Sequence, residues 1–130
     1  MALGDFMASS YNPDLMDRMF DMDPDLLHLL THEITAFAQW DVLRYFLENG
    51  HAQASMDDIS IAVGRDSEAL IDMLGQLTTR GWLARRTDKQ QTIYLLTQEQ
   101  ERRRLLERLH ASFHDHTFRL QVIYHWTQGV

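Results

Sequence analysis

The sequence has 130 residues, enough for one domain with a modest core and one or two appended helices. Hydrophobic residues make up 45% of the chain and charged residues 24%, which is the composition of a folded protein rather than a disordered one. It contains no cysteine, which excludes disulfides, thiolate metal sites and a cysteine nucleophile. No apolar run approaches the roughly 20 residues of a membrane helix, and the first residues lack a signal-peptide pattern. We therefore expect a cytoplasmic protein with no membrane partner.

The net charge of −7 bears directly on function, because proteins that bind nucleic acid usually carry a basic field. Residues 1–33 contain seven acidic residues and one basic residue. Residues 34–97 carry a net charge of −2, and residues 98–130 one of +1. Residues 1–22 hold five of the seven methionines and are predicted to be an acidic arm that packs on its own domain or on a second copy. The arm is also a candidate contact for a protein partner.

Helical periodicity dominates the residues between the arm and Gly81. The run from Asp23 to Asp25 is a helix start, with a capping aspartate, a proline and a second acid. Apolar residues then recur at three- and four-residue intervals as far as Asn49-Gly50, which predicts one long helix or two with a break near residues 31–33.

Two short helices are predicted next. Ser55 caps the first, which stops at Gly64, and Asp66 or Ser67 caps the second, which ends at Gly81. Two short helices joined by a glycine-containing turn indicate a helix-turn-helix.

From residue 82 the periodicity becomes alternating. Residues 82–87 and 91–96 are rich in aromatic and branched side chains and predict two strands. The polar residues 88–90 join them into a hairpin, called the wing below. The predicted fold class is therefore mainly α with a minor β component: a winged helix-turn-helix domain over residues 23–97 with a two-stranded wing.

Residues 98–130 predict a long C-terminal dimerisation helix. Thr97 and Gln100 form a capping-box pattern at its start, and nothing interrupts the helical periodicity up to about Trp126. At 1.5 Å per residue this helix would be about 45 Å long, more than a small domain can cover. Its apolar residues alternate steps of three and four, the pattern of a seam between two helices. The predicted seam residues are Leu106, Leu109, Phe113, His116, Leu120 and Ile123.

The stretch from Met56 to Leu83 resembles the winged-helix core of small bacterial transcriptional regulators of the ArsR, MarR and PadR groups, and the resemblance extends over roughly residues 35–97. It rests on the pair Ile61-Ala62, the turn at Gly64, and a leucine-x-x-x-glycine-tryptophan-leucine exit into the wing that begins at Leu77. In these regulators the second helix of the pair enters the major groove of DNA, and the wing contacts the backbone or the minor groove.

The resemblance implies a set of DNA-facing residues. Gln76 could pair with adenine, and Arg65 or Arg80 could reach phosphate or guanine. Glu68 and Asp72 also face the groove but depart from the pattern, because phosphates disfavour carboxylates. The predicted DNA-binding residues are Arg65, Ser67, Gln76, Arg80, Arg85, Arg86 and Lys89.

The leading prediction is a homodimeric DNA-binding transcriptional regulator whose partners are double-stranded DNA and a second copy of itself. The alternative is a winged-helix protein–protein interaction module with an acidic recognition surface, which does not bind DNA. An exposed hairpin can also carry basic residues for solubility alone.

Metal binding and catalysis receive little support. His114 and His125 match two of the four ligand positions of ArsR-type metal sensors, but Ser112 and Gln128 stand at the other two and are poor zinc ligands. His110 and His114 lie one helical turn apart, a spacing that is common without a metal. No phosphate loop, nucleophile elbow or zinc-protease motif is present. We therefore assign no metal, no cofactor and no catalytic residue, and expect that the protein is not an enzyme.

Overall fold

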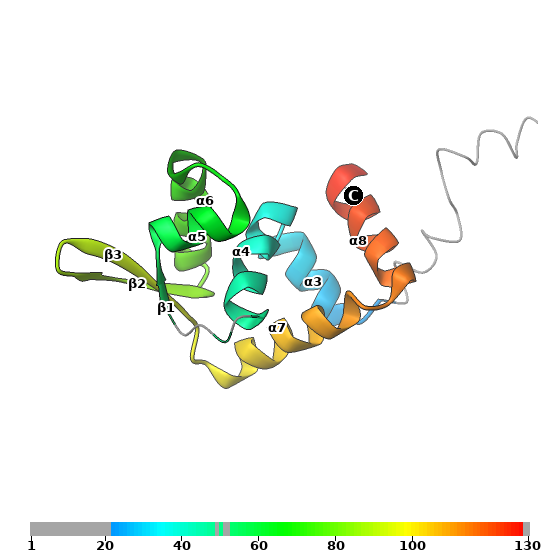
Figure 1. The fold of residues 1–130 in the computed structure, drawn as a ribbon. Helices are drawn as coiled ribbons and strands as arrows, with labels where there is room; N and C mark the ends of the chain where they lie inside the picture. The colour runs from blue at the N-terminus through cyan, green and yellow to red at the C-terminus, as the bar shows by residue number, and fades with distance from the viewer. Residues whose placement is uncertain (1–21, 49, 51–52, 129–130) are drawn as a thin grey trace, which may run out of the picture.

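The computed structural model describes residues 22–48, 50 and 53–128 (Figure 1). The predicted arm therefore lies outside the described residues, apart from Met22, which is buried. The elements in chain order are α3 (Pro24–His32), α4 (Phe37–Glu48), β1 (Gln53–Ser55), α5 (Met56–Val63), α6 (Ser67–Thr79), β2 (Leu83–Asp88), β3 (Gln91–Leu96), α7 (Gln100–Ser112) and α8 (His116–Gln128). No described helix has the length and apolar character needed to cross a membrane.

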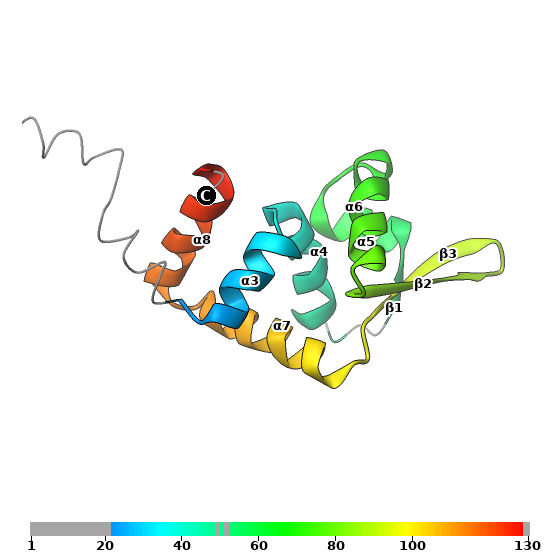
Figure 2. The ribbon, with the colours of Figure 1, turned by 180° about the vertical axis from the view of Figure 1, so that it is seen from behind.

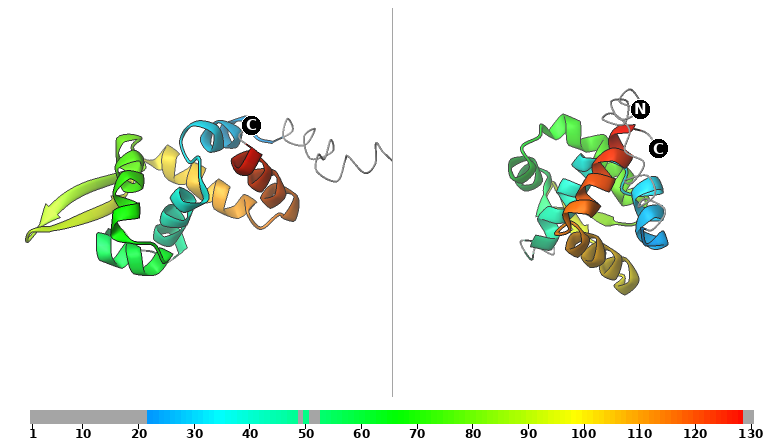
Figure 3. Two further views of the ribbon diagram at one scale, coloured as in Figure 1. Left: turned by 90° about the horizontal axis from the view of Figure 1, so that it is seen from above. Right: turned by 90° about the vertical axis from the view of Figure 1, so that its right-hand side faces the viewer.

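The described part of the molecule is elongated. Figures 1 and 2 show the β2–β3 hairpin projecting from one end and α8 lying at the other, with α7 running along the side between them. Figure 3 shows the same arrangement from above. The core joins α3, α4, α5, α6, α7, α8 and the base of the sheet, and its largest fully buried side chains include Trp82, Phe46 and Leu74.

The two predicted strands are confirmed, and a third short strand joins them. The antiparallel sheet has the order β1-β3-β2, with Ala54 opposite Tyr94 and Leu83 opposite Leu96. The predicted wing turn tightens to two residues, Lys89 and Gln90, whose φ angles are 51° and 67°. A two-residue turn of this kind needs positive φ at both central residues, a conformation that side chains other than glycine rarely adopt.

The helix boundaries predicted from capping patterns are largely confirmed. Of the two alternatives for residues 24–48, the chain adopts two helices, with the break at residues 33–36. Ser55 forms a reciprocal capping box with Asp58 at the start of α5, and Gly64 ends that helix at φ 68°. The capping box predicted for Thr97 and Gln100 is wrong, because Glu99 is the N-cap of α7 and makes no side-chain cap bond.

The predicted continuous C-terminal helix is also wrong. A turn over residues 113–115 separates α7 from α8. Asp115 accepts a hydrogen bond from the backbone N–H of Thr117 at 2.9 Å and so caps α8. Arg119 Nη1 donates to the carbonyl of Phe113 at 2.7 Å, which satisfies a backbone group that the break leaves free.

The predicted dimer seam divides into two sets of residues. Leu106 and Leu109 are fully buried in the core of their own chain. Phe113 stacks on Trp40 of α4, with ring centroids 5.2 Å apart. These three residues pack within one chain, so we correct their assignment to a dimer seam. The remaining three lie on the exposed side of α8: His116, Leu120 and Ile123.

Candidate nucleic-acid interface

Helix α6 is held by its apolar side and presents an acidic side to solvent. Its buried residues are Leu70, Leu74 and Leu77, and the helix packs on α4, α5 and β2. Because successive helical residues turn by about 100°, Glu68 and Asp72 point away from this core, and both are exposed. No lysine or arginine occurs between Ser67 and Thr79. The exposed side of the helix therefore carries two negative charges and no positive one.

Two apolar side chains stand out on the surface of the helix pair. Ile71 of α6 is 55% exposed, and Ile61 of α5 is 82% exposed. Ser67, in the first turn of α6, is half-buried, while Arg65 in the turn before it is exposed. Of the predicted contacts on this side of the domain, Arg65 is the one cation whose side chain makes no hydrogen bond or ion pair with a described residue.

Two predicted DNA contacts of α6 are already engaged within the chain. Gln76 Oε1 accepts a hydrogen bond from Gln39 Nε2 of α4 at 2.9 Å. Reading adenine needs both the oxygen and the nitrogen of the amide, so Gln76 would have to release Gln39 first. Arg80 Nη1 donates to the backbone carbonyl of Glu33 at 2.7 Å, and the side chain is only partly exposed.

The wing carries three exposed cations of the domain. Arg85, Arg86 and Lys89 are all exposed along the hairpin that Figure 1 shows projecting beyond α5 and α6. Arg85 and Arg86 alternate in direction, as neighbours on a strand do, and Arg86 Nη2 donates to Gln53 Oε1 of β1 at 2.7 Å. The side chains of Arg85 and Lys89 make no hydrogen bond or ion pair with any other described residue.

A cavity of about 350 Å³ lies between α4, the end of α7 and α8. The stacked rings of Trp40 and Phe113 form part of its wall. Its polar lining includes Arg44, Arg119, Glu48 and His110, whose Nε2 lies 3.2 Å from Glu48 Oε2. Arg44 is paired with Asp41 at 3.5 Å and with Glu48 at 3.8 Å. This combination of an aromatic wall with a rim of both charges was not predicted from the sequence, because its residues come from helices far apart in the chain.

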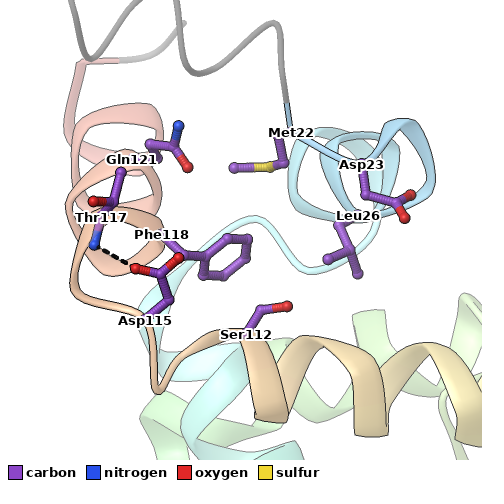
Figure 4. Close-up of a pocket in the computed structure, with 8 residues that line it drawn as sticks. All are labelled: Met22, Asp23, Leu26, Ser112, Asp115, Thr117, Phe118 and Gln121. Carbon is purple, nitrogen blue, oxygen red and sulfur yellow. Dashed lines mark hydrogen bonds between the residues drawn. The ribbon is translucent and has the colours of Figure 1, made fainter.

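A second cavity, of about 450 Å³, lies between the starts of α3 and α8 and the end of α7. Figure 4 shows Asp115 bonded to Thr117, with the ring of Phe118 below Met22. Asp23, on the opposite side, accepts the N–H of Asp25 at 2.8 Å. Both carboxylates of this cavity therefore serve as helix caps.

The electrostatics of Asp23 agree with that role. Desolvation raises the pKa of Asp23, but the hydrogen bond from Asp25 and the guanidinium of Arg108 outweigh it together and hold that pKa below its usual value. Arg108 also pairs with Asp23 directly, which ties the start of α3 to α7.

The two histidines weighed as metal ligands lie in different settings. His114 is exposed in the turn after α7, while His125 is buried against α3 with its Nε2 3.1 Å from Thr31 Oγ1. The Thr31 hydroxyl donates to Leu27 O, so it must accept from His125, and Nδ1 of the ring is left without a partner. Among the described residues, no group of three or more histidine, cysteine, aspartate or glutamate side chains could hold a metal ion.

Solved structures show the same arrangement of elements. A MarR-family transcriptional regulator from Rhodococcus sp. RHA1 is 16% identical, with a TM-score of 0.54 over 97% of this chain and 79% of that chain. The fold is a winged helix-turn-helix. The PcaV transcriptional regulator from Streptomyces coelicolor is 19% identical, with a TM-score of 0.54 over 92% of this chain and 83% of that chain.

A third structure with this winged-helix fold is BpsR from Bordetella bronchiseptica, described with the regulation of its DNA binding by 6-hydroxynicotinic acid. It is 20% identical, with a TM-score of 0.53 over 94% of this chain and 84% of that chain. No protein-family model and no curated protein matches the sequence. The predicted resemblance to small winged-helix transcriptional regulators is thus confirmed at the level of the fold.

Proposed function

We propose that this chain is a DNA-binding transcriptional regulator that acts as a homodimer. The observation that carries the proposal is the wing: a projecting hairpin with Arg85 and Lys89 exposed and free of partners among the described residues. In a winged helix the wing reaches the DNA backbone or the minor groove while the second helix of the pair lies in the major groove. Arg85, Arg86 and Lys89 would then contact phosphates.

The acidic side of α6 determines which bases the proposed interface would recognise. A carboxylate in the major groove can accept a hydrogen bond from the amino group of cytosine, and an apolar side chain can contact the methyl group of thymine. Glu68 and Asp72 fit the first role and Ile71 fits the second. Arg65 and Ser67, at the start of α6, complete the proposed contacts, with Gln76 available once it releases Gln39. We expect weak binding to random sequence, because both carboxylates repel phosphates unless a donor meets them.

The homodimer is proposed from the exposed side of α8. Leu120 and Ile123 are 42% and 45% exposed and lie one turn apart, with His116 one turn before Leu120. An apolar stripe of this kind is typical of a surface that a second copy covers. A two-fold dimer would present two α6 helices to half-sites about one turn of DNA apart.

The cavity beside Trp40 is the proposed site of a small effector. Its stacked aromatic wall suits a planar ring, and the guanidinium group of Arg119 suits a carboxylate, whereas Arg44 is already paired with Asp41 and Glu48. The regulation of BpsR by 6-hydroxynicotinic acid supplies the precedent for an aromatic acid. Because Ile123 of α8 also lines this cavity, a bound ligand would contact the helix proposed to form the dimer.

A second candidate function is a protein-interaction module. The exposed isoleucines Ile61 and Ile71 beside Glu68 and Asp72 favour it, because an apolar surface bordered by acids suits a basic protein segment. In that case the projecting wing would serve solubility, and duplex DNA would not bind.

Fluorescence polarisation with a random duplex pool at low salt separates the two functions. We expect the wild-type protein to bind and the double variant Arg85→Glu/Arg86→Glu to lose binding. The matched control is Arg103→Glu/Arg104→Glu on α7, which changes the net charge equally and should retain most of the affinity. Absence of binding by the folded wild-type protein would reject the DNA-binding proposal and favour the protein-interaction module.

A further inference from the structure

Glu33, the residue that ends α3, lies where α3, α6, the wing and α7 meet. Arg80 Nη1, at the end of α6, donates to the backbone carbonyl of Glu33 at 2.7 Å. Trp82 Nε1, at the start of the wing, donates to Glu33 Oε1 at 3.3 Å. Arg102 Nη1 of α7 lies 3.9 Å from the same carboxylate oxygen. One residue therefore contacts three other elements.

Arg102 connects the same elements from the opposite side. Its Nη1 donates to the carbonyl of Arg80 at 2.9 Å, and its Nε donates to Glu99 Oε2 at 2.9 Å. The guanidinium carbon lies 4.9 Å from the centre of the Trp82 ring, within the range of a cation–π interaction. Gly81 has a φ of 87°, and a Cβ there would lie 3.1–3.3 Å from the guanidinium atoms. The chain thus passes Arg102 at a point where glycine is favoured both by backbone conformation and by space.

Glu33, Arg80, Trp82 and Arg102 form a junction at the base of α6 and of the wing, the two elements proposed to face DNA. α6 ends at this point, and the wing both begins and ends there, because the N–H of Thr97 donates to the carbonyl of Trp82 at 3.0 Å. The Glu33 and Arg102 side chains are only 28% and 30% exposed, so water competes less for these bonds than for those of an ordinary surface ion pair.

On its other side, α3 is held by α8. Trp126 Nε1 donates to the carbonyl of Leu30 at 3.1 Å, and the His125 ring bonds to Thr31 Oγ1. These contacts lie within one turn of Glu33 along α3. The last turn of α3 therefore joins α8, the helix proposed to dimerise, to the elements proposed to meet DNA.

We propose that Glu33, Arg80 and Arg102 are positioning residues that fix the orientation of α6 and the wing relative to α3 and α8. Arg80 then acts through Glu33 rather than by touching DNA, which revises the role predicted for it from the sequence. The expected effect on DNA binding rests on the proposed function. The geometric claim, that these residues fix the orientation of α6 and the wing, does not.

The geometric claim is tested without DNA by distance measurements between two spin labels. The chain has no cysteine, so labels can be introduced at His28→Cys on α3 and Thr87→Cys on the wing, both exposed positions. Mixing with excess unlabelled chain restricts the signal to distances within one chain. We expect a narrow distance distribution for the otherwise wild-type chain and a broadened or shifted one for Glu33→Ala and Arg102→Ala.

Controls separate orientation from stability. Glu33→Gln retains an acceptor for Trp82 and should stay close to the narrow distribution, and Arg104→Ala, an exposed arginine on the same helix, should leave it unchanged. Circular dichroism identifies variants that remain folded. Arg80→Lys, a milder change, replaces Arg102→Ala if the latter fails to fold. Wild-type distributions in folded Glu33→Ala and in the folded arginine variant would overturn the proposal.

A second measurement uses duplexes that carry two half-sites at different spacings. The wild-type dimer should prefer one spacing, near one turn of DNA. Glu33→Ala should bind several spacings with similar affinity, an effect that lower stability alone would not produce. If the wild-type protein binds no duplex, the proposed function fails, while the label distances still decide whether the positioning residues hold the wing. If Glu33→Ala broadens the label distances but keeps the preference for one half-site spacing, only the expected effect on DNA binding is rejected.

Discussion

The wing and helix α6 are the two parts that a winged helix presents to DNA, and in this protein they carry opposite charges. Residues 83–96 contain Arg85, Arg86 and Lys89 against a single aspartate, whereas residues 67–79 contain two acids and no base. In the proposed function the wing therefore supplies attraction to phosphates, and α6 supplies selectivity by rejecting sequences that offer its carboxylates no donor. The difference explains how a chain with a net charge of −7 can bind DNA, because the wing, one short region, supplies the attraction to phosphates.

The largest expected effect comes from preventing dimerisation, which removes the second wing and the second α6 from the complex with DNA. Leu120→Arg places a charge in the proposed α8 interface and should yield a monomer, measured by sedimentation. Without the linked second half-site, operator binding should weaken by about 10²-fold or more. Leu109→Arg, in contrast, places a charge in the core of one chain and should unfold it. A Leu120→Arg protein that remains dimeric would show that α8 does not form the interface.

Neutralising the acids of α6 should change the affinity for random duplex in the opposite direction to removing the arginines of the wing. Glu68→Gln/Asp72→Asn should raise affinity for random duplex by a few-fold, because two repulsive charges are removed. At a selected operator the same variant should bind more weakly, by about 1–3 kcal/mol for each base that α6 no longer reads. Glu107→Gln, an exposed acid on α7, is the charge control. Equal gains for random and selected DNA would contradict base reading by α6.

The wing tip separates stability from binding. Lys89 and Gln90 both hold positive φ, so replacing them with Asn-Gly should raise the free energy of unfolding by about 1 kcal/mol or more, measured by urea titration. The same change removes Lys89 and should reduce the salt dependence of duplex binding by about one phosphate charge. A more stable protein with an unchanged salt dependence would exclude Lys89 from the interface.

The smallest expected effect is a pH dependence of stability that comes from His125, a residue far from both the wing and α6. Burial lowers the pKa of His125, so the unfolded chain takes up a proton more readily than the folded one. The stability that the neutral ring contributes is complete above about pH 6.5 and is lost as the pH falls through the lowered pKa. The melting temperature should therefore fall between about pH 7.5 and pH 5.5, and less so in His125→Gln.

The exposed His28 is the control for that measurement, and His28→Gln should retain the wild-type pH dependence. Asp23 cannot produce the same signal, because the stability gained from its lowered pKa is present above about pH 4 and is lost only in more acidic solution. An equal pH dependence in wild type and His125→Gln would exclude His125 as the source.

Capping patterns and periodicity predicted the helix pair and the wing because these elements are specified locally. Ser55 caps the start of α5 with its side-chain hydroxyl, and the backbone N–H of Gly64 closes its end, while alternating residues 91–96 form β3 as expected. The three-residue strand β1 was too short to leave a pattern. The break before α8 contains neither glycine nor proline, and Asp115, which caps the new helix, resembles any polar residue in a helical run.

Non-local contacts account for the rest of what the sequence could not reveal. A spacing of three and four residues suits a dimer seam and packing within one chain equally, so Leu106 and Leu109 were assigned to the wrong partner. In the sequence Arg80 resembles any arginine at a helix end, and only the fold brings it to Glu33, 47 residues away. The cavity beside Trp40 likewise depends on how α7 and α8 return to α4.

The most direct test of the central claim is the salt dependence of duplex binding by the wild-type protein and by Arg85→Ala/Arg86→Ala. If the wing supplies the attraction, the logarithm of the binding constant should fall linearly with the logarithm of salt concentration. The double variant should show a slope that is shallower by about two, one for each phosphate that an arginine no longer neutralises. Equal slopes for the two proteins, or no binding by the folded wild-type protein at low salt, would contradict a DNA-binding role for the wing.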